Sequence, residues 1–261
     1  MDFSYTSYEQ LLKTLHSQGF LFCTLLDYFE SSNLMQPFII IRHDVEARYE
    51  NALYFAQIQH EMGIKGSYYF RLLPKSYNGT VIKQIAALGH EIGYHYDDLS
   101  HCKGNYEKAI QRFRKNLVHL REIAPIVTIT MEGAPLSRYD NRDLWKKFNY
   151  KDFGILGEPY FDINFNDLFY LTDTGRRWDG QLYNVRDKAT KENPITNPQF
   201  LNLRYHATGD IIRAVNDGLF PRKAMLNFHP QRWNDKPLPW IKEFILQNIK
   251  NQGKRILIKL R

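Results

Sequence analysis

Two carboxylates stand beside a histidine at the end of an apolar run. The stretch IIIRHDVE, residues 39–46, passes from three isoleucines to Arg42, Asp44 and Glu46. Polar side chains are costly to bury in such a place unless they have partners or a chemical task. Paired carboxylates near histidine can hold a divalent metal ion, or they can act as acid and base on a bound substrate. Either use suits the hydrolysis of an amide or ester.

Other apolar runs of the chain also end on acidic or histidine side chains. These residues are His95 with the following Asp98, Glu132, Asp173 and His229. Residues two apart in a strand share a face, as Asn227 and His229 would. We therefore expect polar side chains to line one face near the strand ends and apolar side chains to cover the other.

Eight apolar runs predict strands, and helical patterns separate most of them. The predicted strands are 37–44, 66–73, 90–96, 126–131, 153–156, 168–173, 224–229 and 255–260. Strands that alternate with helices favour a mainly parallel sheet. The pattern predicts one domain over residues 1–261, an α/β fold with a distorted (β/α) barrel of seven to eight strands. In such folds the chemistry lies at the carboxyl ends of the strands, which would bring the polar residues to one rim.

The charge of the chain favours an anionic partner. Its formal net charge is +7 and its pI is near 9.2. The basic residues form no run of five, and no nucleic-acid-binding motif accompanies them. We therefore expect no nucleic-acid partner, because a small substrate that carries phosphate would account for the same sign of charge.

Targeting signals and cysteine patterns are not evident. The first residues, MDFSYTSYEQLLKTL, resemble neither a signal peptide nor a transit peptide, and no apolar run is as long as a membrane span. Cys23 and Cys102 fit no metal-binding pattern and no disulfide framework. These features predict a cytoplasmic protein without a membrane span.

Four short motifs together resemble a known enzyme family. They are HDVE (43–46), SYYF (67–70), GHEIGYH (89–95) and NFHP (227–230). In this order they resemble the polysaccharide deacetylases of the NodB-homology, or carbohydrate esterase, type. The resemblance covers roughly residues 37–230. The stretches 132–145, 170–180 and 229–233 further resemble a subfamily near bacterial surface-polysaccharide gene clusters.

The resemblance implies a NodB-like barrel, a zinc-type divalent ion and the removal of acetyl groups from sugars. By matching motifs, it makes Asp44 the general base and Glu46 a metal ligand. It makes His95 a second metal ligand and His229 the residue that stabilises the leaving group. The implied function is hydrolysis of a carbon–nitrogen bond in surface polysaccharide or lipopolysaccharide biosynthesis.

One position departs from the family pattern. The family usually has a second metal histidine four residues after the first, and this chain has Leu99 there. His101, Asp98 or Glu132 could complete the metal site instead. If none does, the metal is lost, and the alternative is a metal-free carbohydrate-binding homologue that acts as an accessory protein.

Several further residues are candidates for substrate binding. Arg42 could bind substrate or pair with Asp44. Asp173 and Arg176 belong to a charged cluster of the kind that can clamp a phosphate. Arg232 and Trp233 could offer a charge and a stacking face to a sugar. We expect the sugar to be nucleotide- or lipid-linked, since the negative phosphates of such a substrate would complement the positive net charge of the protein.

Overall fold

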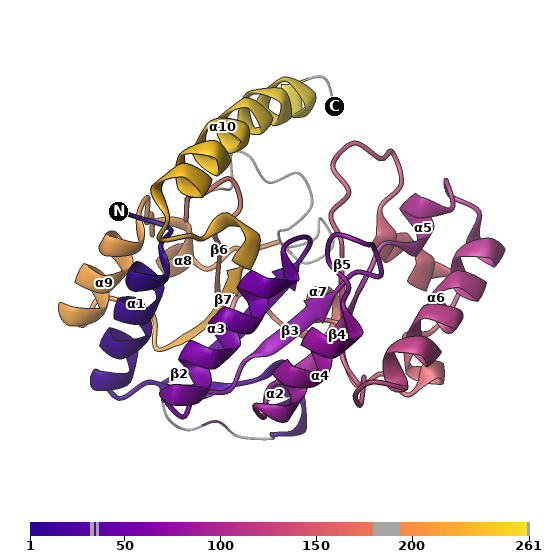
Figure 1. Cartoon of the computed structure of the whole chain (residues 1–261), viewed down its shortest axis with the longest axis horizontal. Coiled ribbons are helices and arrows are strands. Elements are labelled where there is room, and N and C mark those ends of the chain that lie inside the picture. The colour runs from indigo at the N-terminus through magenta and orange to yellow at the C-terminus, as the bar shows by residue number, and fades with distance from the viewer. Residues whose placement is uncertain (32–33, 35–36, 180–193, 260–261) are drawn as a thin grey trace.

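Seven parallel strands form one curled sheet at the centre of the molecule (Figure 1). The computed structural model describes residues 1–31, 34, 37–179 and 194–259, with side chains as far as residue 253. The strand order is β5-β4-β3-β2-β7-β6, and β1 pairs with the beginning of β2. The strands are β1 (Leu21–Cys23), β2 (Phe38–Val45), β3 (Ser67–Phe70), β4 (Glu91–Tyr96), β5 (Ile129–Met131), β6 (Phe169–Thr172) and β7 (Lys223–Phe228).

The sheet curls into half a barrel and does not close. Strands β5 and β6 are its two ends, and no described pairing joins them. Residues 153–156, expected as a strand, contribute no ladder; beside β5 there is only an isolated bridge between Thr128 and Gly157. The chain between β5 and β6 folds instead into the short helices η1 (Asn141–Lys146), η2 (Tyr150–Phe153) and α7 (Pro159–Asp162). The mainly parallel α/β fold is confirmed, whereas a closed barrel is not formed.

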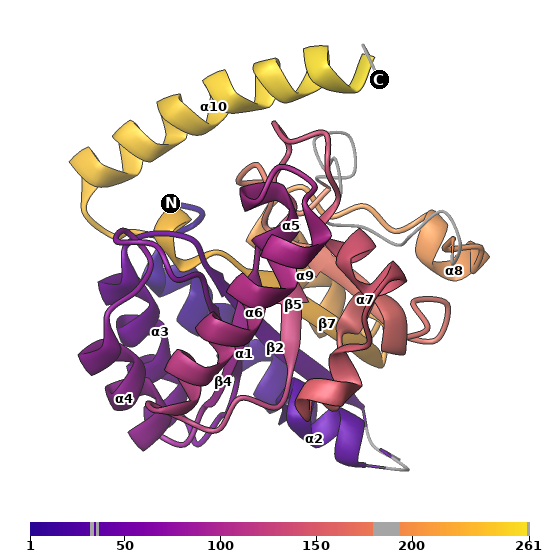
Figure 2. The same cartoon turned by 90° about the vertical axis from the view of Figure 1, so that its right-hand side faces the viewer.

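Helices cover the outside of the curled sheet, and α10 lies over the loops at one end of it (Figure 2). The longer ones are α1 (Tyr5–Ser17), α3 (Tyr49–Glu61), α4 (Gly79–Ala87), α6 (Tyr106–Arg121), α9 (Thr208–Asn216) and α10 (Pro237–Lys259). The shorter ones are α2 (Leu25–Glu30), α5 (Asp98–His101), α8 (Pro198–Leu201) and η4 (Pro230–Arg232). Helix α6 shows the local logic: the side chain of Asn105 caps its first turn, and Ile110, Phe113 and Leu117 turn its apolar face inward.

The C-terminal end of the chain differs from the sequence-based expectation. The run 255–260 was expected as a strand, but helix α10 continues as far as Lys259, and residue 260 lies outside the described part. A short apolar run does not distinguish helix from strand by periodicity alone. No helix among the described residues is both long enough and apolar enough to cross a bilayer.

Strand β2 is the centre of the core, and its two faces differ. All eight of its residues are buried, because β3 and β7 flank it. His43 points to the helix side, where its ring stacks on Tyr68 and lies 3.1 Å from the Tyr8 hydroxyl. Arg42 and Asp44 therefore point to the concave face of the sheet. The polar residues of β2 are thereby divided between a packing role and the candidate site.

Candidate functional site

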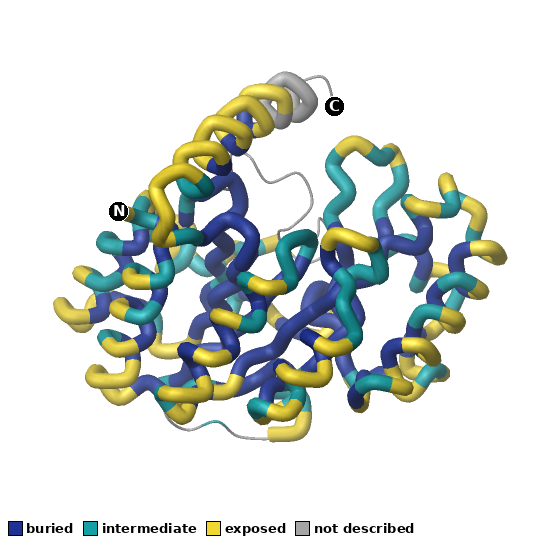
Figure 3. Tube along the Cα trace, viewed as in Figure 1, coloured by how far each residue is buried: buried dark blue, intermediate teal, exposed yellow. Residues whose placement is uncertain are grey.

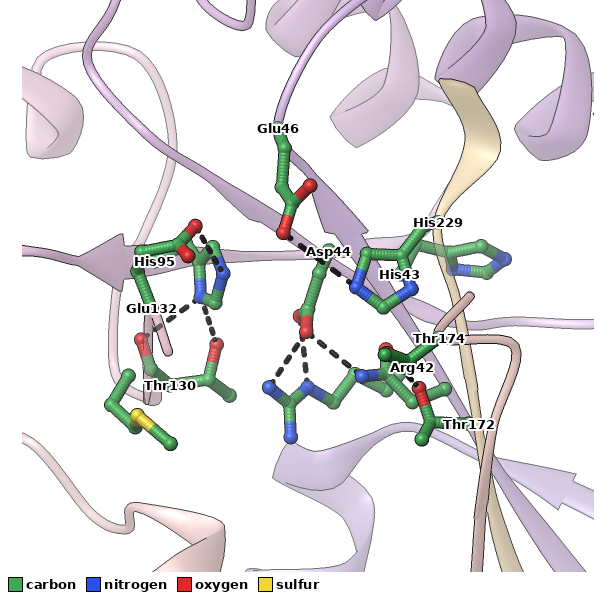
Figure 4. Close-up of polar contacts among 12 residues, drawn as sticks. Arg42, His43, Asp44, Glu46, His95, Thr130, Glu132, Thr172, Thr174 and His229 are labelled. Atoms are coloured by element: carbon green, nitrogen blue, oxygen red, sulfur yellow. Dashed lines mark hydrogen bonds and ion pairs between the residues drawn. The ribbon is translucent and has the colours of Figure 1, made fainter. Parts of the chain in front are cut away.

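Three side chains from different strands meet at the carboxyl ends of β2, β4 and β5 (Figure 4). They are Glu46, just after β2, His95 in β4 and Glu132, just after β5. One potential ligand atom of each lies within 4.8 Å of the others. The register between β4 and β5 sets His95 opposite Thr130. Glu132 lies two residues after Thr130 and therefore on the same face of the sheet. The exposed fractions of these side chains are 29% for Glu46, 3% for His95 and 8% for Glu132, so the group is approached from the Glu46 side.

The ring of His95 is oriented by the neighbouring strand. Its Nδ1 lies 3.1 Å from the carbonyl oxygen of Thr130 and 2.9 Å from the Thr130 hydroxyl. A carbonyl oxygen can only accept, so Nδ1 is the donor, and Nε2 is the ring nitrogen that faces the group and is available to a metal ion. Nε2 lies 3.6 Å from Oε2 of Glu132. Histidines that bind metals are commonly held this way through their other nitrogen.

Glu132 is fixed by its own loop and by an arginine. Its Oε1 accepts a hydrogen bond from the backbone N–H of Ala134 at 3.0 Å. Nη1 of Arg71 lies 3.0 Å from Oε2, and Nη2 of the same guanidinium donates to Asp97 at 2.6 Å. Oε2 is buried and makes no well-aligned hydrogen bond. This oxygen therefore keeps acceptor capacity for another ligand.

A second acid–histidine pair faces the first group from β6 and β7. Nδ1 of His229 donates to Oδ1 of Asp173 at 2.6 Å, and Nε2 lies 3.7 Å from Oε1 of Glu46. Asp173 also accepts from the backbone N–H of His229, from Arg232 at 2.9 Å and from the indole of Trp233 at 2.6 Å. Burial and Arg232 act to lower the pKa of His229, but Asp173 and Glu46 outweigh them and raise it. The pKa of His229 is raised and that of Asp173 is lowered, so His229 is the residue of this pair that can carry a proton near neutral pH.

Asp44 lies between the two groups and is paired within its own strand. Arg42 donates to both carboxylate oxygens, from Nε at 2.9 Å and from Nη2 at 2.8 Å, and Asn227 donates at 2.8 Å. Burial acts to raise the pKa of Asp44, but Arg42 and the nearby histidines hold it well below its usual range. Asp44 therefore stays ionised throughout the neutral range.

The donor set at Glu46, His95 and Glu132 fits a divalent metal ion. Two carboxylates and one imidazole are ligands that zinc and similar ions accept. Two ligand atoms bound tetrahedrally at about 2.1 Å from one ion lie roughly 3.4 Å apart. The 3.6 Å between His95 Nε2 and Glu132 Oε2 is close to that separation. Burial acts to raise the pKa of Glu46, but His229 and Arg232 lower it overall, so this ligand is ionised as well.

The other candidates for the third ligand lie elsewhere. Leu99 is buried in the core and His101 is exposed at the end of α5. Asp98 is buried and bonded to the Tyr94 hydroxyl and to Arg112. Of the three possible completions, the described structure brings only Glu132 to Glu46 and His95.

Two expected substrate-binding residues have different surroundings from those expected. Trp233 is fully buried in an aromatic cluster with Phe228, so it has no free face for a sugar, and its indole instead positions Asp173. Arg176 is turned toward helix α10: its guanidinium lies 4.4 Å from the ring centroid of Trp240 and donates to the Trp240 carbonyl. Both residues follow the right strands, but sequence spacing does not give the direction of a loop side chain.

Arg71 and Gln231 contact the group although the sequence did not single them out. Arg71 follows β3 directly, and Nε2 of Gln231 donates to Oε2 of Glu46 at 3.0 Å. Arg71 lies inside the predicted strand 66–73, whereas the observed β3 already ends at Phe70, so its place at a strand end could not be read from the predicted bounds. Gln231 belongs to the stretch HPQRW, in which the sequence predicts His229, Arg232 and Trp233 as site residues.

Comparisons with known proteins did not assign the chain to a family. No family model matches it, and neither a curated protein nor a solved structure shows significant similarity. The resemblance to polysaccharide deacetylases therefore rests on the four motifs alone.

Proposed function

We propose that this protein is a metal-dependent hydrolase that removes an acyl group, N-acetyl in the first place, from a sugar. One observation carries the proposal: the ligand group Glu46, His95 and Glu132 faces the His229–Asp173 pair across one rim. A metal group opposite a proton carrier is the arrangement that amide hydrolysis needs. The motif resemblance supplies the sugar, the preference for zinc, the NodB-like identity of the half-barrel and the role in surface-polysaccharide or lipopolysaccharide biosynthesis.

The ligand group would hold the metal through Glu46, His95 and Glu132. When bound, such an ion polarises the acyl carbonyl and makes water more acidic. The protein's own residues then divide the proton transfers. Asp44, ionised and adjacent, accepts the proton of the attacking water, and His229 delivers a proton to the departing sugar nitrogen. Asp173 fixes the His229 ring and stabilises its charged form.

The proposal is tested by acetate release together with metal content. We expect protein purified without chelators to contain about one zinc-type ion per chain and to release acetate from nucleotide- or lipid-linked N-acetyl sugars. Dialysis against a chelator should remove both properties, and added zinc should restore both. Acetate release that survives complete metal removal would contradict the proposal, as would a metal-loaded protein that is inactive on the whole panel.

A metal-free carbohydrate-binding protein is the second candidate, and Arg71 favours it. The guanidinium of Arg71 lies 3.0 Å from Glu132 and 2.6 Å from Asp97, so it partly supplies the positive charge that an ion would bring. Leu99 in place of the usual histidine points the same way. This reading predicts sugar binding with no metal even after reconstitution. Metal analysis of wild type and Arg71→Gln separates the two, because loss of Arg71 should strengthen metal binding only where a metal site exists.

A further inference from the structure

Helix α10 lies along one side of the molecule and contacts it through a narrow strip (Figures 1 and 2). Only Glu243, Gln247 and Asn251 are buried among its residues with described side chains. They are spaced four residues apart and therefore form one face of the helix. All three are polar, which is the reverse of the usual arrangement for a helix packed on a core.

The inward face is held by specific polar contacts. Glu243 pairs with Arg48 at 3.3 Å, and the side chain of Asn251 donates to the carbonyl oxygen of Gly175 at 2.9 Å. Near the start of the helix, the guanidinium of Arg176 lies over the rings of Trp240 and Phe244. Arg48 follows β2, and Gly175 and Arg176 follow β6. The helix therefore rests on the loops of the rim that carries the candidate site.

The opposite face of α10 is exposed (Figure 3), and large aliphatic side chains line it. The exposed fractions are 81% for Leu238, 47% for Ile241, 53% for Ile245 and 65% for Ile249. Ile241, Ile245 and Ile249 each lie two residues from an inward-facing position, which is about 200° around the helix. A continuous stripe of large aliphatic side chains of this kind usually marks an interaction surface.

Charge decides between the possible occupants of this stripe. The helix sequence contains Lys242, Lys250, Lys254, Arg255 and Lys259, and its one acidic residue, Glu243, is turned inward to Arg48. Lys242 and Lys250 are both exposed, Lys242 beside the apolar stripe and Lys250 between the stripe and the inward face. Two copies of this face would bring lysines together without acidic partners on the described part. An anionic lipid surface accepts both the aliphatic stripe and the basic flanks.

We propose that α10 docks the protein on the surface of an anionic phospholipid bilayer, with Leu238, Ile241, Ile245 and Ile249 inserted at the headgroup boundary. Since α10 rests on the loops of the rim, docking would hold the candidate site close to the bilayer. This consequence, which rests on the proposed function, makes a lipid-linked sugar the preferred substrate. The docking itself is independent of hydrolysis.

The experiment is co-sedimentation of the full chain with vesicles. We expect binding to vesicles that contain phosphatidylglycerol, little binding to pure phosphatidylcholine, and weakening with added salt. The triple variant Ile241→Ser/Ile245→Ser/Ile249→Ser should bind at least about tenfold more weakly. Lys242→Gln/Lys250→Gln should lose about fivefold for each lysine, from ~1 kcal/mol per basic residue near an anionic surface.

Leu219→Ser is the matched control. Leu219 is 72% exposed but precedes β7, at the other end of the sheet, so this change should leave vesicle binding unaltered. Circular dichroism would show that the variants remain folded. Equal binding by wild type and the triple variant would overturn the proposal. So would a wild-type dimer that the triple variant converts to monomer without any vesicle binding, because a second copy would then cover the stripe. If the wild-type protein binds vesicles but releases no acetate, the result counts against the proposed function and not against docking.

Discussion

His95 and His229 stand on opposite sides of β2 and differ in what holds their Nδ1 atoms. For His95 the partner is the neutral carbonyl and hydroxyl of Thr130; for His229 it is the buried carboxylate of Asp173. Both rings are buried, and Nε2 of each faces a glutamate. The carbonyl of Thr130 orients the His95 ring without adding a charge at Nδ1, whereas the carboxylate of Asp173 stabilises the protonated ring of His229 and raises its pKa. The difference assigns metal binding to one side and proton transfer to the other.

The largest expected effect comes from removing each ring in turn. His95→Ala should lose the metal and with it all measurable activity, since even partners of a ligand affect affinity about 10- to 100-fold. His229→Ala should keep the metal and lose only turnover. Elemental analysis and acetate release on the same preparations would check this. If both variants keep the metal, or both lose it, the assignment of metal binding to the His95 side and proton transfer to the His229 side is wrong.

Asp44 lies between the two sides, and its variants separate chemistry from structure. Asp44→Asn should lower turnover by about 100- to 10,000-fold. It should also lower the free energy of unfolding by about 3 kcal/mol, because Arg42 would be left buried without its charge partner. The double variant Arg42→Met/Asp44→Asn should recover much of this stability, as followed by urea unfolding. Recovery of activity along with stability would show that Asp44 is structural.

Asp173→Asn tests the role of His229 through the pH dependence of turnover. The raised pKa of His229 means that its charged form contributes stability fully below the unfolded value of 6.5, and that this contribution is lost as pH rises through the folded pKa. As the proton donor, His229 should make turnover fall over the same alkaline range. The variant should lower turnover about 100-fold and move this fall to lower pH. A pH–rate profile with an unchanged alkaline limb would assign the proton to another group.

The smallest effect is expected on the His95 side. Thr130→Val removes the hydroxyl partner of Nδ1 but leaves the carbonyl oxygen of the same residue in place. Metal affinity should fall by about tenfold, with stability little changed. Titration with zinc in a competing chelator would measure it. Thr172→Val, at the corresponding end of β6, is the control and should leave metal affinity unaltered.

Strand-end reasoning identified the residues of the site better than it identified their roles. Parallel strands bring their carboxyl ends together, so Glu46, His95, Glu132 and His229 could be expected at one rim from their positions alone. The indole of Trp233 turns into the core because the chain after β7 bends into η4, and no sequence pattern specifies that bend. The open edge beside β5 was also not predicted, because residues 153–156 have strand-like composition but form no ladder, and the isolated bridge beside β5 joins Thr128 to Gly157.

The strand order has a consequence for synthesis of the chain. Strand β7 lies between β2 and β6 and pairs with both, although almost the whole domain separates it from β2 in sequence. One edge of β2, which includes Ile39, Ile40 and Ile41, therefore stays unpaired until residues 223–228, which form β7, leave the ribosome. At about 5–20 residues per second that wait is roughly 10–40 s. During this time an apolar strand edge is available to other chains, so we expect a cell to need chaperone protection for this protein late in translation.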